Sequence, residues 1–300
     1  MPDNISNPLL SLSEALAERA RLARPLVAGI AAPGRRPRSG MLWRKDVVVA
    51  SEQAFPDVDE ATVTLADGGT FPAHVAGRDA GTNVIALRLD GTPEPTHSAA
   101  AEPRPGALAL ALGAEDAGIS IRLGIIHSVG PSWHSRAGGR IDRRISLDMT
   151  VSAREEGGPV LDAAGGVLGI STLGPRRRVL VIPSSTVDGV IEPLLSTGRV
   201  ERGWLGVTLQ PVLIPEGLQS EAGGSRGLMI MGVSKGGPAA QANAHVGDIL
   251  VAIGGQNVTS PAMVAHRLGP DSVGHQIELR LIRAGNLVAL PVTVAARPLK

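Results

Sequence analysis

Short apolar runs separated by Gly, Pro or Asp dominate this chain from residue 41 onward. Strands of all-β domains show this spacing, with turn residues between short apolar or alternating segments. The pattern therefore predicts a mainly β fold with two packed β-barrels. The predicted strands cover residues 41–43, 46–51, 61–65, 70–77, 84–89, 107–112, 120–129, 144–150, 167–172 and 178–182.

A helical segment and a second strand-rich unit follow these strands. Residues 186–197 have apolar positions at helical spacing and end at Gly198, a usual stop signal for a helix. A new strand-rich unit opens at Arg202. We therefore predict an N-terminal helix with a linker (1–38), a double-barrel domain (39–200) and a C-terminal domain (201–300).

An amphipathic helix is predicted at the N-terminus. Ser11 and Glu14 stand at the positions of a capping box, in which each side chain hydrogen-bonds the backbone N–H of the other residue. Apolar residues recur at helical spacing as far as Val27, and Pro25 marks the end of the helix. The helix is expected to pack on its own domain, to contact another subunit or to lie on a membrane surface. The Pro-, Gly- and Arg-rich residues 32–39 are expected to form a linker.

Composition narrows the function classes. The chain has 300 residues, 43% of them hydrophobic, with 38 Gly and 23 Pro, which suits two β-rich domains. A net charge of +1 gives no argument for nucleic acid as a partner, and the basic run Arg176 to Arg178 is predicted to be a solvated hairpin tip. The absence of Cys excludes disulfides and thiol catalysis. No segment resembles a signal peptide or a membrane span, so a chain starting at Met1 is expected to be cytoplasmic.

Residues 153–159, Ala-Arg-Glu-Glu-Gly-Gly-Pro, keep the frame of a serine-protease nucleophile loop. Chymotrypsin-like proteases read Gly-Asp/Asn-Ser-Gly-Gly-Pro there, and the loop N–H groups stabilise the oxyanion that forms when the serine attacks a carbonyl. Glu156 stands where that serine would be. The remnant of the oxyanion loop is formed by Arg154, Glu155 and Gly157. A carboxylate at this position would repel the developing oxyanion.

From about residue 39 to its end, the chain resembles the HtrA/DegP family, in which a trypsin-like double barrel precedes a PDZ domain. The resemblance rests on segments that occur in family order, at residues 61–68, 75–79, 124–130, 156–169, 181–184 and 202–207. It implies the same two-domain architecture here.

The resemblance places Gln53, Asn83 and Glu156 at the His, Asp and Ser positions of the family's catalytic triad. The family's Thr-Asn-x-His-Val-Val corresponds to residues 50–55, and its Thr-Asp-Leu-Ala corresponds to residues 82–85. The Gln53 amide cannot exchange a proton near pH 7, and a neutral Asn83 cannot stabilise an imidazolium. These departures predict a catalytically inactive pseudoprotease, and the alternative is an endopeptidase with non-standard catalytic groups.

No replacement chemistry is predicted elsewhere. The seven His residues show no metal-ligand spacing, so neither a metal nor any other cofactor is expected. Ser152 lies too far from Glu156 along the chain to take the place of the nucleophile. Glu155 and Glu156 are expected to point in different directions. The Glu156 carboxylate is expected to fold back onto the loop N–H groups and to plug the site.

The C-terminal unit resembles PDZ domains, which bind a partner's C-terminal peptide as an added strand. A glycine-containing loop of such domains holds the peptide carboxylate with its backbone N–H groups. Residues 261–268 are predicted to form the helix that borders the groove. The predicted peptide site consists of Gly203, Trp204, Leu205, Gly206 and Val207 in the loop, and Met263 and Val264 on that helix.

Together these patterns predict a scaffold, adaptor or chaperone-like subunit that takes C-terminal or extended peptides of partner proteins in its PDZ groove. The rivals are the endopeptidase named above and a purely structural subunit of a larger complex. HtrA-like barrels commonly trimerise through N-terminal segments, so the resemblance implies a homo-trimer, or attachment to a partner, through residues 9–27. Neither nucleic acid nor a membrane span is expected.

Overall fold

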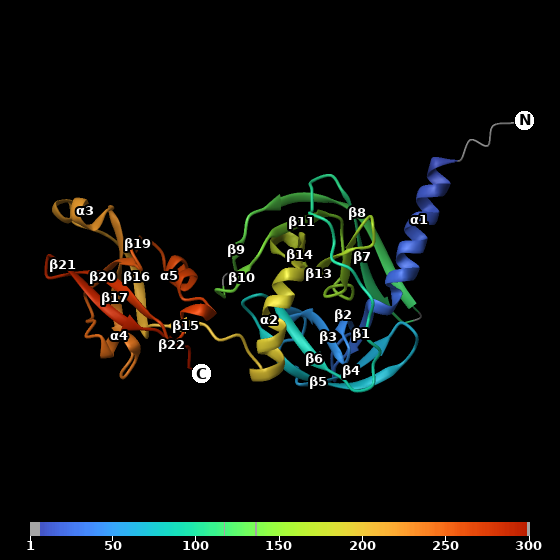
Figure 1. Cartoon of the computed structure of the whole chain (residues 1–300), viewed down its shortest axis with the longest axis horizontal. Helices are drawn as coiled ribbons and strands as arrows, with labels where there is room; N and C mark the ends of the chain where they lie inside the picture. Colours follow the sequence, from blue (N-terminus) through green and yellow to red (C-terminus); the bar gives the residue numbers. More distant parts are fainter. Residues whose placement is uncertain (1–6, 117, 136, 299–300) are drawn as a thin grey trace, which may run out of the picture. The chain divides into compact units, whose positions relative to one another are not determined.

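The computed structural model describes residues 7–116, 118–135 and 137–298. The ends of the predicted N- and C-terminal parts, residues 1–6 and 299–300, therefore lie outside the described residues. The chain divides into two compact units at Arg199 and Val200. The first unit contains two closed six-stranded barrels and the second a separate sheet, which confirms the predicted mainly β fold (Figure 1).

The first barrel closes in the order β1-β2-β3-β6-β5-β4, with antiparallel neighbours throughout. Exposed and buried residues alternate along the whole of β4, because successive side chains of a strand point to opposite faces. The interior of this barrel is filled by aliphatic side chains around Phe55. The strands are β1 (Val27–Ala31), β2 (Arg38–Arg44), β3 (Val47–Ser51), β4 (Glu60–Leu65), β5 (Thr70–Asp79) and β6 (Val84–Arg88).

The second barrel closes in the order β11-β14-β13-β12-β7-β8, again with antiparallel neighbours. Its strands are β7 (Leu108–Glu115), β8 (Gly118–Gly130), β11 (Arg144–Asp148), β12 (Pro159–Asp162), β13 (Val167–Leu173) and β14 (Val179–Pro183). A short hairpin of β9 (Trp133–His134) and β10 (Arg140–Ile141) lies between β8 and β11. Helix α2 (Ser184–Thr197) follows β14 and packs on β5 of the first barrel.

Each of the ten predicted strands overlaps an observed one, but two barrel strands were not predicted. Strand β12 begins at the proline of the Gly-Gly-Pro segment of the nucleophile-like loop and is only four residues long. Strand β1 continues the apolar spacing of the N-terminal helix, so the sequence pattern assigned Val27 to that helix. Pairing of β1 with both β2 and β4 decides its conformation. Residues 32–37 are consequently the connection inside a hairpin, and the linker prediction is wrong.

The N-terminal helix begins earlier than its capping-box pattern predicts. Helix α1 (Pro8–Ala23) is capped by Asn7, whose Oδ1 accepts a hydrogen bond from Leu9 N–H at 3.1 Å. Asn is among the best N-cap residues, and Pro fits the first helical position because its missing N–H has no helical partner there. Ser11 is thus already inside the helix, and the capping-box prediction is wrong. A 3-10 turn, η1 (Arg24–Leu26), joins α1 to β1.

The second unit contains a sheet in the order β16-β17-β18-β20-β21, with β19 paired to β18. Leu228, Leu250 and Leu281 are among its fully buried core residues. Strand β16 is an end strand of this sheet. The strands are β15 (Gly203–Trp204), β16 (Val207–Leu213), β17 (Arg226–Val233), β18 (Ile249–Ile253), β19 (Gln256–Asn257), β20 (Gln276–Arg283), β21 (Asn286–Thr293) and β22 (Ala295–Ala296), and the helices are α3 (Glu216–Ala222), α4 (Pro238–Gln241) and α5 (Pro261–Arg267).

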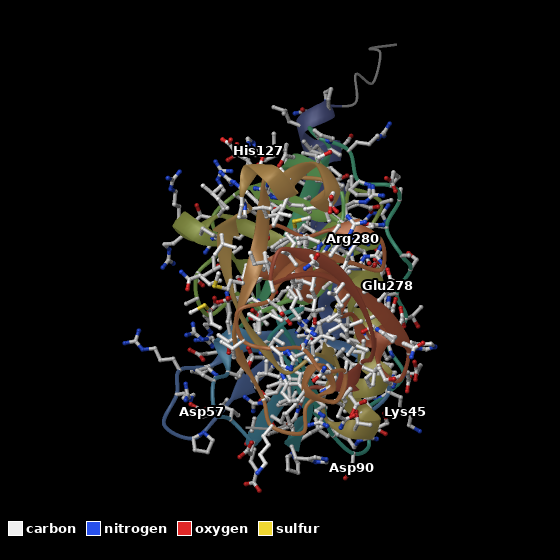
Figure 2. All side chains as sticks on the ribbon, turned by 90° about the vertical axis from the view of Figure 1, so that its left-hand side faces the viewer. Lys45, Asp57, Asp90, His127, Glu278 and Arg280 are labelled. Atoms are coloured by element: carbon white, nitrogen blue, oxygen red, sulfur yellow. The ribbon has the colours of Figure 1, made fainter. Side chains whose placement is uncertain are left out.

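Several charged side chains lie on the outside of the first barrel. Figure 2 shows Lys45, Asp57 and Asp90 at its edge, and all three are exposed. Among the described residues, no helix is long and apolar enough to cross a membrane.

Candidate functional site

The structure brings Gln53, Asn83 and Glu156 together where the two barrels meet. Gln53 lies in η2 (Glu52–Ala54), directly after β3, and Asn83 directly precedes β6. Gln53 Nε2 is 2.6 Å from Glu156 Oε1, and the backbone N–H of Gln53 donates to Asn83 Oδ1 at 2.8 Å. Asn83 has a left-handed φ of 61°, which Asn tolerates better than most residues. The three positions named by the resemblance therefore form one hydrogen-bonded cluster.

Glu156 is only 5% exposed, and its Oε1 is surrounded by donors. Besides Gln53, it accepts hydrogen bonds from the Ser51 hydroxyl, the Thr172 hydroxyl and the Leu173 N–H, each at 3.1 Å. These partners belong to β3 and β13. The prediction that the carboxylate folds back onto the N–H groups of its own loop is therefore wrong. Donors on neighbouring strands satisfy it instead, as a buried carboxyl group requires.

Ser51 and Thr172 were not singled out from the sequence, although they complete the cluster. Asn83 Nδ2 donates to the Thr172 hydroxyl at 2.8 Å and to the Ser51 hydroxyl at 3.1 Å. Both hydroxyl residues are buried. The available signal was a polar residue at the end of an apolar strand, in Ser51 of β3 and Thr172 of β13. Such a residue is buried only if it has a partner.

Glu155 points away from this cluster, as predicted, and ties its loop to β8. It is 2% exposed and accepts hydrogen bonds from the Ser152 N–H at 2.6 Å, the Ser120 hydroxyl at 2.8 Å and the Arg122 guanidinium at 2.8 Å. Burial raises the pKa of Glu155, but these hydrogen bonds together lower it by more, so its pKa lies below the ordinary value. The carboxylate is thus held in its charged form.

The loop backbone around Glu156 is held from both barrels. Gly157 has a φ of +94°, and a Cβ there would lie 2.3 Å from the Ser39 carbonyl oxygen, so only glycine fits. Its N–H donates to the Ser171 carbonyl at 2.9 Å, and the Ser39 hydroxyl donates to the Arg154 carbonyl at 2.7 Å. Within the described residues, the backbone N–H groups of Arg154 and Glu156 donate no hydrogen bond. Two loop donors therefore remain for a ligand oxygen.

A cavity of about 580 Å³ opens beside the cluster, and Gln53, Asn83 and Thr172 form part of its wall. Apolar side chains and backbone of the second barrel form the opposite wall. Among the described residues, no group of three or more His, Cys, Asp or Glu side chains is placed to hold a metal ion. The site thus presents amide, hydroxyl and carboxylate groups next to an apolar cavity.

The predicted peptide site of the second unit is only partly assembled as expected. Gly203 and Trp204 form β15, paired with β22, and so do not belong to an open loop. Leu205 and Gly206 follow as the loop, and Gly206 has a φ of +77°. The Leu205 side chain is 2% exposed and packs into the core, on which the partly buried Val207 of β16 also packs.

In the second unit, the loop of Leu205 and Gly206 leads into β16, whose outer edge is open to a ligand. Within the described residues, the N–H groups of Leu205 and Gly206 donate no hydrogen bond, although their carbonyls accept from Ala239 N–H at 2.9 Å and Ser234 N–H at 2.7 Å. Helix α5 lies beside β16.

The two residues that we expected on the groove helix differ in exposure. Met263 is 39% exposed, and its sulfur accepts a hydrogen bond from the Thr259 hydroxyl at 3.4 Å. Val264 is 6% exposed and belongs to the core of the second unit. Met263 is therefore the one of the two that presents a side chain to solvent.

Comparisons with known proteins agree with this architecture. A family model described as a trypsin-like peptidase domain matches residues 38–170, and one described as a PDZ domain matches residues 203–294. A protein of Brucella suis biovar 1 named "Probable periplasmic serine endoprotease DegP-like" is 29% identical over 272 residues, or 87% of this chain and 52% of that protein. A protein of Rhizobium meliloti with the same name is 30% identical over 280 residues, or 88% and 54%. The chain thus spans about half the length of these relatives.

Solved structures share the fold over nearly the whole chain. The serine endoprotease from Yersinia pestis is 26% identical with a TM-score of 0.75, and the match covers 94% of this chain and 98% of that one. The HtrA-type protease AlgW with a tripeptide is 26% identical with a TM-score of 0.73, and the match covers 95% and 98%.

These comparisons overturn two predictions. The relatives are named serine endoproteases, which contradicts the prediction that the chain is not an enzyme. That prediction rested on the side-chain types at the three triad positions, Gln53, Asn83 and Glu156. The relatives are also named periplasmic, which contradicts the predicted cytoplasmic location. That prediction rested on the residue at which the sequence begins, which carries no information about compartment. The double barrel, the PDZ unit and these matches together show that the chain belongs to the HtrA-like family of trypsin-like serine proteases with a PDZ domain.

Proposed function

We propose that this HtrA-like chain captures the C-terminal peptides of partner proteins along β16 and works as a scaffold, adaptor or chaperone-like subunit. The observation that carries the proposal is the pair of unused N–H groups of Leu205 and Gly206, at the start of an end strand. A peptide carboxylate would accept from these donors while its backbone pairs with β16. The AlgW structure described with a tripeptide supports peptide binding by this architecture.

The expected affinity follows from small contributions to the binding free energy. Strand addition gains backbone hydrogen bonds, and burying one aliphatic side chain contributes about 1.5–3 kcal/mol. The ordering of the peptide opposes both terms. Dissociation constants near the micromolar range, about 8 kcal/mol of binding free energy, are therefore expected for apolar C-termini.

Titration of fluorescently labelled peptides with the full chain tests this proposal. A short peptide ending in an apolar residue with a free carboxylate should bind more tightly than the same peptide with an amidated C-terminus. Equal affinities would argue against carboxylate capture. Absence of binding to any C-terminal peptide would favour a structural subunit of a larger complex.

An endopeptidase with non-standard catalytic groups is the second candidate. The names of the relatives favour it, and so does the Thr172 hydroxyl, which donates to Glu156 Oε1 at 3.1 Å beside the cavity. A hydroxyl next to a carboxylate is a possible pairing of nucleophile and base. Hydrolysis of casein by the purified protein, abolished by both Thr172→Val and Glu156→Gln, would support it. Hydrolysis unaffected by either substitution would exclude this pair.

We also propose a homo-trimer, or attachment to a partner, through α1. Leu9 and Leu12 of this helix are 76% and 44% exposed, which leaves an apolar surface for another chain. The names of the relatives favour a periplasmic location. Fractionation of cells that express the native gene tests the location, since a periplasmic protein is released by osmotic shock.

A further inference from the structure

The turn between β13 and β14 forms one wall of the cavity and carries an unpaired basic cluster. Pro175 lines the cavity, and Arg176, Arg177 and Arg178 follow it directly. All three arginines are exposed, and none forms an ion pair with a described residue. Because the whole chain has a net charge of only +1, this turn is a local concentration of positive charge.

The backbone of this turn is unusual. Arg176 and Arg177 both have a φ of 57°, in the left-handed region that residues other than Gly seldom occupy. Such a conformation costs about 1–2 kcal/mol per residue and is concentrated at functional sites. The Gly174 N–H donates to the Arg178 carbonyl at 2.8 Å, which closes the turn beside the cavity.

The cavity itself is apolar on the side of the second barrel. Leu173, Leu180 and Ile141 line it together with Trp133 of the β9-β10 hairpin. Glu52 is the acidic residue among the described residues that line the cavity. Its carboxylate is paired with Arg78, whose Nη1 lies 3.9 Å from Oε1. The carboxylate of Glu52 therefore does not cancel the charge of the arginine turn.

Two hydrogen-bonding groups at the cavity wall have no partner. Trp133 Nε1 and Ser135 Oγ are buried and make no hydrogen bond with the described residues. The hairpin that carries them is pressed against the first barrel, because a Cβ on Gly139 would lie 2.1 Å from the carbonyl carbon of Gly81. Buried polar groups without partners are rare in proteins and call for an explanation. Both atoms are closed off from solvent, so in this structure the hairpin contributes the apolar Trp133 side chain to the cavity, not a hydrogen bond.

The strand edge at this cavity is already occupied. Gln53 Nε2 donates to the Leu173 carbonyl at 2.9 Å, and the Gly174 N–H is used inside the turn. The Leu173 N–H also donates, to Glu156 Oε1 at 3.1 Å, so an extended segment finds neither the Leu173 nor the Gly174 N–H free for strand pairing. Recognition must come from a side chain entering the cavity and from charges outside it.

From these observations we infer that the arginine turn makes the cavity of the candidate site selective for internal peptide segments in which acidic residues flank an apolar side chain. The apolar side chain fills the cavity between Trp133 and Leu180, and the flanking carboxylates face Arg176 to Arg178. This site deepens the proposed peptide-binding function, but it needs no C-terminal carboxylate.

Two probe peptides test the site without involving carboxylate capture. Both are short, acetylated and amidated, with a central Leu, and they carry either Asp or Lys on both sides. Fluorescence anisotropy with the full chain should show the Asp peptide binding at least about tenfold more tightly than the Lys peptide, with the difference shrinking at high salt. Replacing the central Leu of the Asp peptide by Ala should also weaken binding. These comparisons need no variant protein.

Matched variants then locate the site. The double substitution Arg176→Glu with Arg177→Glu should abolish the preference for Asp over Lys. Its control is Arg35→Glu with Arg36→Glu, which changes the net charge equally at two exposed arginines of the first barrel. Trp133→Ala should weaken binding of the Asp peptide, since it removes an apolar wall of the cavity. Gly206→Val, which is directed at the PDZ loop, should leave this binding unchanged.

Several results would overturn the inference. Equal affinities for the Asp and Lys peptides would remove the charge selection. An equal loss in the Arg35 and Arg36 control would show attraction by net charge alone. Loss of Asp-peptide binding in Gly206→Val would assign the peptide to the PDZ unit. If C-terminal peptides do not bind but the Asp and Lys peptides behave as expected, the proposed C-terminal capture fails and this site remains supported.

Discussion

Gln53 Nε2 lies 2.6 Å from Glu156 Oε1, so one side-chain hydrogen bond joins the first barrel to the second at the centre of the candidate site. The same amide nitrogen also donates to the Thr172 hydroxyl at 3.1 Å. Gln53 follows β3, while Glu156 precedes β12 and Thr172 lies in β13. The side chains at the triad-equivalent positions therefore help to hold the two barrels together. This structural role is independent of any catalysis.

Removing the Glu156 carboxylate should destabilise the double barrel. Glu156→Ala leaves the Leu173 N–H without its acceptor and removes one of the acceptors of the Gln53 amide, so we expect a loss of about 2 kcal/mol in the free energy of unfolding. Calorimetric melting of the full chain measures it. The matched control is Glu60→Ala, because Glu60 is exposed on β4. A Glu156→Ala protein as stable as the control would contradict the buried network.

The Glu155 carboxylate should make the double barrel sensitive to acid. Its folded pKa lies below the ordinary value, so its stabilising contribution is full above the unfolded pKa of about 4.3 and is lost as the pH falls through the folded pKa. Glu155→Gln should therefore cost about 2 kcal/mol at pH 7, and less in acid. Melting temperatures of both proteins between pH 7 and pH 3 test this. A gap that stays constant with pH would rule out the charged form as its cause.

A separate ion pair should control the stability of the second unit. Asp248 is 3% exposed and accepts two hydrogen bonds from the Arg283 guanidinium, at 2.9 Å and 2.7 Å. Because Asp248 is buried while Arg283 is partly exposed, the guanidinium can be partly solvated, and Asp248→Asn should cost the second unit about 2 kcal/mol. Calorimetry should show the change in the melting of that unit. The exposed Asp271→Asn is the control, and an equal effect there would refute the assignment.

Gly206 should be essential for capture of C-terminal peptides. A valine there must adopt a φ of +77°, and its Cβ would lie 3.2 Å from the Trp204 ring. Gly206→Val should weaken peptide binding at least about tenfold, or about 1.4 kcal/mol. Gly285→Val is a matched control, since Gly285 has a φ of +81° with no atom within 4 Å of its Cβ. Equal peptide affinities of the two variants would place the carboxylate site elsewhere.

Association through α1 should depend on its exposed leucines. Deletion of residues 1–38 is unsuitable as a test, because it would remove β1 from the first barrel. Leu9→Glu with Leu12→Glu should instead convert a trimer to a monomer in light scattering. Leu213→Glu changes a leucine that is 74% exposed in β16 and should leave the mass unchanged. A monomeric mass for the unaltered protein would exclude the trimer and leave only attachment to a different protein.

Local sequence pattern was enough for most of the strands and for the order of the domains. Alternation of apolar and polar residues acts between near neighbours, and turn residues end each run, so β4 and its hairpin with β5 could be predicted. The Gly-Gly-Pro frame likewise located the loop that carries Glu155 and Glu156. Strand β1 was missed because its apolar run also fits a helical period. Only pairing with β2 and β4 separates the two conformations.

Tertiary structure alone decided the partners within the candidate site. Ser51 lies 105 residues before Glu156, and Gln53 lies 103 residues before it, yet both hydrogen-bond the same carboxylate oxygen. A contact between residues so far apart in the sequence leaves no trace in the local pattern of apolar and polar residues. The unused N–H groups of Leu205 and Gly206 and the unpaired arginine turn are further examples, because the absence of a partner depends on everything packed nearby. Sequence determined which groups were present, and folding determined which of them met.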